Sequence, residues 1–243
     1  MAWADGRREP RPERLRLPLT PPQAVAATTA LRWRPAGAPA PCGAARAGLV
    51  LGHSAGTEVT DPLLGRAAAG LAGHGHPVLS FNFAYREAGR RRPDPAGRLQ
   101  AAFRDAAAFA RQLAGGPLVL GGRSMGGRIA SHLAAQGERC AGLALLGYPL
   151  HPAGQPERLR TAHWPDLRVP VLFVQGDRDR LCRLDLLERQ RRRLLGHLDT
   201  SVHVLAGADH SFSVSGGAPE KVGEEIISVV AGWLAALTLQ ELP

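Results

Sequence analysis

Residues 118–127, LVLGGRSMGG, decide how this chain of 243 residues should fold. Residues 118–120 form a short apolar run that is typical of a buried strand, and a helical pattern begins directly after Ser124. Ser124 is the centre of a G-x-S-x-G motif at this strand-to-helix turn. A nucleophilic serine needs such a strained turn, because the flanking glycines let the neighbouring backbone approach closely. The stretch therefore predicts that Ser124 is a nucleophile.

The sequence on both sides of this turn alternates between short apolar runs and helical patterns. Strands are expected at residues 28–34, 48–51, 78–83, 118–120, 143–146, 169–174 and 202–205. Helices are expected at residues 61–73, 94–113, 125–136, 183–195 and 222–237. Strands that alternate with helices build right-handed crossovers and a parallel sheet. We therefore expect one α/β domain over residues 46–243, behind a Pro- and Arg-rich leader over residues 1–45 that holds only the first of these strands.

The composition is that of a globular protein with an excess of arginine. Hydrophobic residues make up 44% and charged residues 21%, so the chain can bury a sizeable core. The net charge is +9, and Lys221 is the only lysine among the 30 basic residues. Such a charge raises the question of nucleic acid, but the densest clusters, residues 90–92 and 189–193, have no aromatic platform beside them. We expect no nucleic-acid partner and interpret the charge as a bias spread over solvent-facing helices.

Several other classes of protein are excluded by simple features. No apolar stretch approaches the roughly 20 residues that span a bilayer, and the arginine pair at residues 7–8 is not followed by the apolar segment of an export signal. The cysteines Cys42, Cys140 and Cys182 have no metal-type spacing, which favours a reducing, cytoplasmic location without disulfides. No pair of histidines at i, i+4 on a helix suggests a metal site, and no cofactor motif appears. No feature specifies an oligomeric state.

The G-x-S-x-G pattern occurs a second time, at residues 52–56, GHSAG. Ser54 lacks the strand-to-helix context, because residues 57–60 separate this copy from the helix expected at Asp61. Only about 50 residues precede it, whereas a nucleophile of this kind follows several strand–helix units. Ser124 is therefore favoured, with Ser54 as the alternative nucleophile.

The copy at residues 52–56 is better suited to a supporting role. A loop after an early strand commonly supplies one N–H group of an oxyanion hole, and the residue after the nucleophile supplies the other. Here the donors would be the amide of Ser54 or Ala55 and the amide of Met125. The alternative is that residues 52–56 form only a tight glycine turn.

A serine nucleophile needs a base, and the base needs a carboxylate that orients it. His210 follows the strand expected at residues 202–205, and Asp177 and Asp179 follow the strand expected at residues 169–174. Carboxyl ends of parallel strands are where such sheets bind ligands. We predict His210 as general base and Asp179 as the orienting acid, since Asp179 reaches further into its loop; Asp177 is the alternative. Asp209 is disfavoured because adjacent residues on a turn rarely point the same way.

These residues are part of a wider resemblance. From about Ala47 the chain resembles the α/β-hydrolase superfamily. Residues 122–128 (GRSMGGR), 147–152 (GYPLHP) and 169–176 (VPVLFVQG), with Leu159, Arg160 and His163, are similar to a branch of predicted hydrolases related to dienelactone hydrolase. That branch also includes a testis-expressed protein and the hydrolase-like domain of a chromatin acetyltransferase complex subunit.

The resemblance implies an α/β-hydrolase fold, with helices on both faces of a mostly parallel sheet, and a triad of Ser124, Asp179 and His210. Members of the branch carry His-Gly-Ala-Gly in the oxyanion loop, whereas Ser54 replaces the first of these glycines here. About 20 residues separate the strands that end and begin near residues 147 and 169, which favours a short or absent lid and a small substrate.

The predicted function is hydrolysis of a small carboxylic ester, lactone or thioester through an acyl-enzyme. The alternative is a non-catalytic binding or scaffold domain, because a fold of this kind does not require catalysis. The sequence does not select among the three kinds of acyl substrate.

Overall fold

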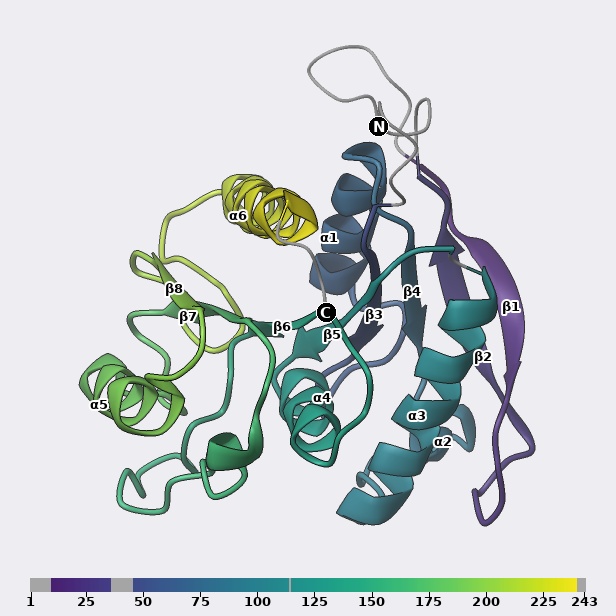
Figure 1. Cartoon of the computed structure of the whole chain (residues 1–243), viewed down its shortest axis with the longest axis horizontal. Helices are drawn as coiled ribbons and strands as arrows, with labels where there is room; N and C mark the ends of the chain where they lie inside the picture. The colour runs from purple at the N-terminus through teal and green to yellow at the C-terminus, as the bar shows by residue number, and fades with distance from the viewer. Residues whose placement is uncertain (1–9, 36–45, 114, 240–243) are drawn as a thin grey trace.

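The computed structural model describes residues 10–35, 46–113 and 115–239. Eight strands in these ranges form one sheet (Figure 1). Their bounds are β1 (Glu13–Pro18), β2 (Ala27–Trp33), β3 (Gly48–Gly52), β4 (Val78–Phe81), β5 (Leu118–Arg123), β6 (Gly142–Leu146), β7 (Val171–Gly176) and β8 (Thr200–Leu205). The order across the sheet is β1-β2-β4-β3-β5-β6-β7-β8. This order brings the ends of β3, β5, β6, β7 and β8 to one edge.

The sheet is mostly parallel, as predicted. Strands β3 to β8 pair in parallel, while β2 runs antiparallel to both β1 and β4. The central strands β3, β4, β6 and β7 are buried along their whole length. Nearly continuous apolar strands are what a parallel sheet requires when helices cover both of its faces.

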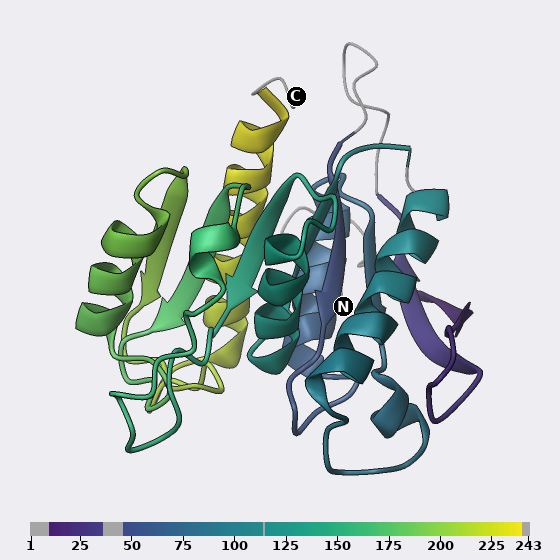
Figure 2. The ribbon, with the colours of Figure 1, turned by 60° about the horizontal axis from the view of Figure 1, so that its bottom comes forward.

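Helices form a layer on each face of the sheet (Figure 2). The helices are α1 (Pro62–Gly73), α2 (Ala84–Glu87), α3 (Ala96–Leu113), α4 (Met125–Ala135), α5 (Leu184–Leu195) and α6 (Pro219–Leu239), with a 3₁₀ turn η1 (Trp164–Asp166). One apolar core lies between the sheet and α3, α4 and α5, and a second lies between the sheet, α1 and α6. The expected α/β-hydrolase fold with helices on both faces is thus confirmed.

The prediction for the first part of the chain was incomplete. A strand was expected at residues 28–34, where β2 lies, but β1 was missed. β1 is a charged edge strand of sequence ERLRLP in which only Leu17 is fully buried, so its alternation of leucine and arginine was hidden in a Pro- and Arg-rich stretch. β1 and β2 join the same sheet as the later strands. The boundary between leader and domain was expected at residue 45. Residues 36–45 lie outside the described residues, so this boundary stays a prediction.

Two short helical elements were also missed. α2 and η1 contain four and three residues, too few to produce a periodic pattern. η1 is the only helical element between β6 and β7 in the described chain, so no lid domain is inserted there. In the ranges that the structure covers, no helix has the length and apolarity to cross a membrane.

Candidate active site

Ser124 lies on the turn that joins β5 directly to α4, as predicted. Its backbone has φ 52° and ψ −110°, a conformation that residues other than glycine rarely adopt. The Ser124 amide donates a hydrogen bond of 2.8 Å to the carbonyl of Leu146 in β6. Strained residues of this kind persist only where the surrounding structure fixes them, and they cluster at functional sites.

The glycines of the Ser124 motif (residues 122–126) pack against the Ser54 motif (residues 52–56). Gly52 of β3 is paired with Gly122 of β5. A Cβ atom on Gly122 or Gly126 would lie 2.2 or 2.0 Å from the Gly52 carbonyl oxygen. No side chain fits in that space, so only glycine permits this approach. The two motifs therefore lie against each other at the same edge of the sheet.

His210 connects Ser124 with Asp179. Its Nε2 lies 2.9 Å from Ser124 Oγ, and its Nδ1 lies 2.8 Å from Asp179 Oδ2. Because a carboxylate can only accept, Nδ1 carries the proton and Nε2 is left to accept from the serine hydroxyl. The Asp179 side chain is fully buried, whereas that of His210 is 26% exposed. Loops after β5, β7 and β8 thus bring these three predicted residues together.

Further hydrogen bonds fix the carboxylate of Asp179. Gln175 Nε2 donates to Asp179 Oδ2 at 2.5 Å, and the Leu181 amide donates to Oδ1 at 2.7 Å. Gln175 is fully buried near the end of β7. Gln175 was not predicted from the sequence, because its only signal is one amide residue in an otherwise apolar strand, VLFVQG.

The two other acids that were considered are engaged elsewhere. Asp177 Oδ1 accepts a hydrogen bond of 2.7 Å from the Gly207 amide. Asp209 Oδ1 accepts from the amides of Ser211 and Ser213 at 2.8 and 2.9 Å. These bonds shape the loop that carries His210, while Asp179 is the acid that contacts its ring.

The carbonyl groups of the Ser54 motif are held by two aromatic side chains. His53 is fully buried; its Nε2 accepts from the Phe83 amide at 3.1 Å, so its Nδ1 donates to the Ser54 carbonyl at 2.7 Å. Burial lowers the pKa of His53 to about 4, which keeps the ring neutral. The Tyr85 hydroxyl donates to the Ala55 carbonyl at 2.8 Å. Tyr85 was missed because it lies on α2.

The amide groups expected to form an oxyanion hole are free of hydrogen bonds to the described part of the chain. Within the described residues, the amides of Ser54, Ala55 and Met125 donate to no acceptor. The Met125 amide is the first of α4, where the helix dipole favours negative charge. The Ser54 hydroxyl is also buried without a partner, so no base reaches this serine in the described chain.

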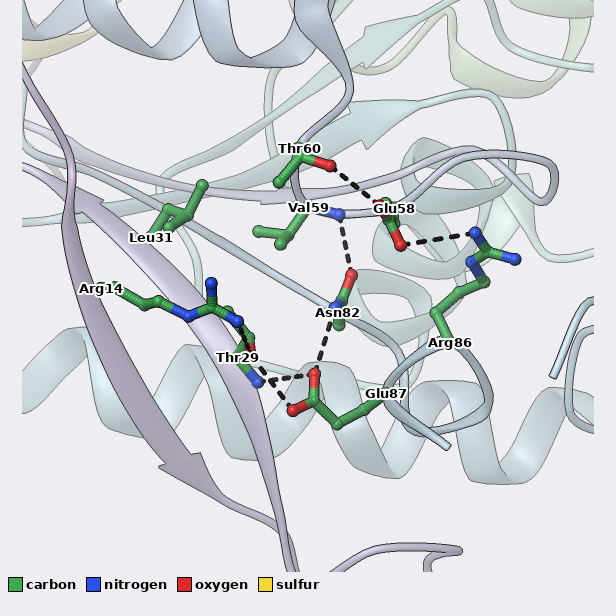
Figure 3. Close-up of a pocket in the computed structure, with 9 residues that line it drawn as sticks. All are labelled: Arg14, Thr29, Leu31, Glu58, Val59, Thr60, Asn82, Arg86 and Glu87. Atoms are coloured by element: carbon green, nitrogen blue, oxygen red, sulfur yellow. Dashed lines mark hydrogen bonds and ion pairs between the residues drawn. The ribbon is translucent and has the colours of Figure 1, made fainter. Parts of the chain in front are cut away.

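A polar cavity of about 340 Å³ lies beside α2 and residues 58–60, which follow the Ser54 motif (Figure 3). Its lining residues are Arg14, Thr29, Leu31, Glu58, Val59, Thr60, Asn82, Arg86 and Glu87, which include none of the predicted site residues. Asn82 accepts from the Val59 amide at 2.8 Å and donates to Glu87 at 3.1 Å.

Glu87 links the elements that line this cavity through hydrogen bonds to Thr29 and Asn82. Burial alone would raise the pKa of Glu87, but hydrogen bonds from Asn82, Thr29 and Arg16 lower it to about 2. The ionised carboxylate thus ties α2 to β2, and α2 in turn carries Tyr85 under the Ser54 motif. Among the described residues, no cluster of three or more His, Cys, Asp or Glu side chains has an arrangement that would hold a metal.

The fold and the site place the chain in the class of α/β-hydrolase-fold proteins. The order of the strands, the serine on its tight turn and the adjoining histidine and aspartate are all typical of that class. Residues 45–236 match the model of a family described as an alpha/beta hydrolase domain. The chain belongs to this alpha/beta hydrolase family, and that membership supports the interpretation of the protein as a hydrolase.

Solved structures share the fold at low sequence identity. An alpha-beta serine hydrolase homologue from Coxiella burnetii is 17% identical, with a TM-score of 0.70 over 90% of this chain and 97% of that one. A serine hydrolase without a lid from Xanthomonas campestris is 20% identical, with a TM-score of 0.68 over 96% of each chain. Dienelactone hydrolase from Anabaena variabilis is 18% identical, with a TM-score of 0.66 over 94% of this chain and 99% of that one. The expected likeness to dienelactone hydrolases is confirmed at the level of the fold; the links to a testis-expressed protein and a chromatin complex subunit stay predictions.

Proposed function

We propose that the protein is a serine hydrolase that cleaves a small carboxylic ester, lactone or thioester through an acyl-enzyme. The observation that carries this proposal is the chain of hydrogen bonds from Asp179 through His210 to Ser124. Family membership and the serine hydrolases among the structural neighbours support it. The dienelactone hydrolase neighbour is the reason to retain a lactone among the substrates.

In the proposed reaction, His210 Nε2 takes the proton of Ser124 as Oγ attacks the acyl carbon. Asp179 holds the ring in the tautomer that this step needs and stabilises the imidazolium that forms. His210 then donates the proton to the leaving oxygen or sulfur, which leaves Ser124 acylated. Water, deprotonated by His210, attacks the acyl-enzyme and releases the acid.

The negative oxygen of each tetrahedral intermediate needs hydrogen-bond donors. We assign this role to the amide of Met125 and to the amide of Ser54 or Ala55, which have no other acceptor among the described residues. His53 and Tyr85 position them by holding the carbonyls of the same loop. Loss of one such donor typically costs about a hundred- to a thousand-fold in rate.

The proposal extends to the setting of the reaction. It describes a single hydrolase domain, whose sheet includes β1 and β2, that acts on a small molecule in the cytoplasm, needs no cofactor, and binds neither nucleic acid nor membrane. The competing proposal, a binding or scaffold domain, keeps the same fold and lacks a reactive serine.

Labelling with a fluorophosphonate probe separates the two proposals. The wild-type protein and Ser54→Ala are expected to give one covalent adduct, located at Ser124 by peptide mass spectrometry, while Ser124→Ala stays unlabelled. Circular dichroism of all three proteins controls for folding. A folded wild-type protein that is not labelled, or an adduct on Ser54, overturns the proposal.

A further inference from the structure

Two partly buried arginines, Arg128 and Arg160, form no ion pair within the described residues. Arg128 lies on the first turn of α4, where its amide donates to the Ser124 carbonyl at 3.0 Å. It belongs to the half-exposed face of α4, together with Met125 and His132. The charge of Arg128 acts on His132, His163, Tyr148 and Arg160, so its guanidinium lies near these residues, one helical turn from Ser124 along α4.

Arg160 is held opposite this helix face by the connection between β6 and β7. Its amide donates to the Leu150 carbonyl at 2.8 Å, and its carbonyl accepts from the Tyr148 hydroxyl at 2.7 Å. Tyr148 is fully buried, and its hydroxyl accepts a hydrogen bond of 3.3 Å from Trp164 Nε1 of η1. In Figure 1 the green segment with η1 lies between α4 and α5, and η1 contacts both helices.

Further contacts close the cluster on the α4 side. Ser131 donates to the Arg128 carbonyl at 2.8 Å, so its hydroxyl accepts from His163 Nε2, also at 2.8 Å. The rings of His132 and His163 stack with centroids 3.7 Å apart. Burial lowers the pKa of both histidines, that of His163 to about 3, and the charge of Arg128 lowers both further. These histidines therefore stay neutral, and they fix the shape of the cluster.

The guanidinium groups themselves have few partners. A guanidinium has five N–H donors. The side chain of Arg128 donates to no described residue, and its Nε is buried; Arg160 makes one bond, of 3.3 Å, to the Pro149 carbonyl. Neither forms an ion pair within the described residues. Arg123, on the other side of Ser124, is different: it pairs with buried Asp61 at 2.7 Å.

Among the described residues, the charges that act on Arg160 are positive. Burial lowers the pKa of Arg160, and the charges of Arg128 and Arg158 lower it further, while no carboxylate acts in the opposite direction. Partly buried cations without a counterion are costly in a folded protein. An oxyanion from solution would relieve this cost, and the planar fork of arginine matches carboxylate and phosphate groups.

We propose that Arg128 and Arg160 form a subsite for an anionic group of the substrate, a carboxylate or phosphate a few bonds from the scissile acyl group. This inference rests on the proposed function and narrows its substrate to negatively charged esters, lactones or thioesters. The two arginines are specificity-determining residues, because they contact the substrate away from the reacting atoms.

A matched pair of substrates tests the subsite. We compare kcat/KM for the mono-4-nitrophenyl ester of glutaric acid, which carries a carboxylate, with that for the neutral 4-nitrophenyl pentanoate. The wild-type protein is expected to prefer the anionic ester, and Arg128→Gln or Arg160→Gln to lower that preference by about tenfold or more. Arg128→Lys and Arg160→Lys should keep part of it, since they keep the charge. Added salt should reduce the wild-type preference, because the site is partly exposed.

Arg189→Gln is the matched control. Arg189 is an exposed arginine of α5, so this variant loses the same charge and should keep the wild-type preference. Thermal unfolding of each variant controls for folding, and the lysine variants carry the test if a glutamine variant does not fold. A preference within twofold of wild type in both arginine-to-glutamine variants overturns the inference and leaves the proposed function intact.

Free anions provide a second test. Glutarate and inorganic phosphate should inhibit hydrolysis of the neutral ester competitively, and inhibition by phosphate alone would indicate an effector site rather than a substrate subsite. If the wild-type protein cleaves neither ester and is not labelled, the proposed function fails. The subsite is then tested by the shift in Tm on adding glutarate: a shift that Arg128→Gln abolishes supports an anion site, and no shift overturns it.

Discussion

The Ser54 and Ser124 motifs have the same G-x-S-x-G pattern and lie at the ends of the neighbouring strands β3 and β5, yet their serines differ. Ser124 enters α4 at once, with a positive φ, and contacts His210. Ser54 is followed by a loop that reaches α1 only at Pro62, and its hydroxyl is buried without a partner in the described chain. The chemistry of the pattern therefore depends on the element that follows it.

The motifs also differ in what holds them. Two side chains from distant loops, Asp179 and His210, converge on the Ser124 motif. The Ser54 motif is held through its backbone, by His53 within it and by Tyr85 of α2. In our proposal the first arrangement moves a proton and the second only orients amides. The following variants test this division, from the largest expected effect to the smallest.

The largest effect is expected from the acid that serves the Ser124 motif. Asp179→Asn should lower kcat for a 4-nitrophenyl ester by about ten-thousand-fold, because the amide no longer holds the tautomer of His210 that accepts a proton. Asp177→Asn is the matched control, since Asp177 binds the Gly207 amide instead. Equal losses in the two variants would show that His210 is not oriented by Asp179.

The last glycine of each motif allows a comparison of stability. Gly126→Ala should lower the free energy of unfolding by about 3 kcal/mol or prevent folding, because its Cβ would lie 2.0 Å from the Gly52 carbonyl oxygen. Gly56→Ala meets no atom within 4 Å, and it should be neutral or stabilising by up to about 1 kcal/mol. Urea unfolding measures both, and a Gly126→Ala protein as stable as wild type would contradict the tight contact between the motifs.

The smallest effect concerns the neutral histidine of the Ser54 motif. The pKa of His53 is about 4 in the folded protein, against an ordinary value of 6.5. Between pH 6.5 and 4, His53 is therefore protonated in the unfolded chain but remains neutral in the folded protein. This part of the free energy of unfolding is fully present above pH 6.5 and is lost as the pH falls towards 4, by about 2 kcal/mol at pH 5.

The variant His53→Asn separates the pH dependence that comes from His53 from that of the other histidines. The variant is less stable overall, but between pH 6.5 and 4 its free energy of unfolding should fall less steeply than that of wild type. Parallel curves for the two proteins would mean that His53 is not held neutral, and that the Ser54 motif is not fixed by the hydrogen bonds described above.

The sequence predicts those residues of the candidate site whose positions follow from the order of strands and helices. Ser124, Asp179 and His210 are found because each follows a recognisable strand, and parallel strands bring their ends to one edge. Gln175 and Tyr85 are not found: one is a single polar residue in an apolar strand, and the other lies on a helix too short to be periodic. β1 is missed for the same reason, since an edge strand buries too little to leave a clear apolar pattern. Residues that the order of the sheet positions can thus be predicted from the sequence, whereas residues that are placed only by packing cannot.

The contact among Gly52, Gly122 and Gly126 limits which substitutions these positions can accept during evolution. The two glycines of the Ser124 motif meet the same carbonyl, that of Gly52, and a Cβ on Gly52 would itself lie 2.9 Å from the Cα of Gly126. A substitution at one position is not relieved by a change at another, because each collision is with backbone. The three sites should therefore accept mutations neither singly nor in pairs, while residue 54, on the same loop, is free to drift between serine and glycine.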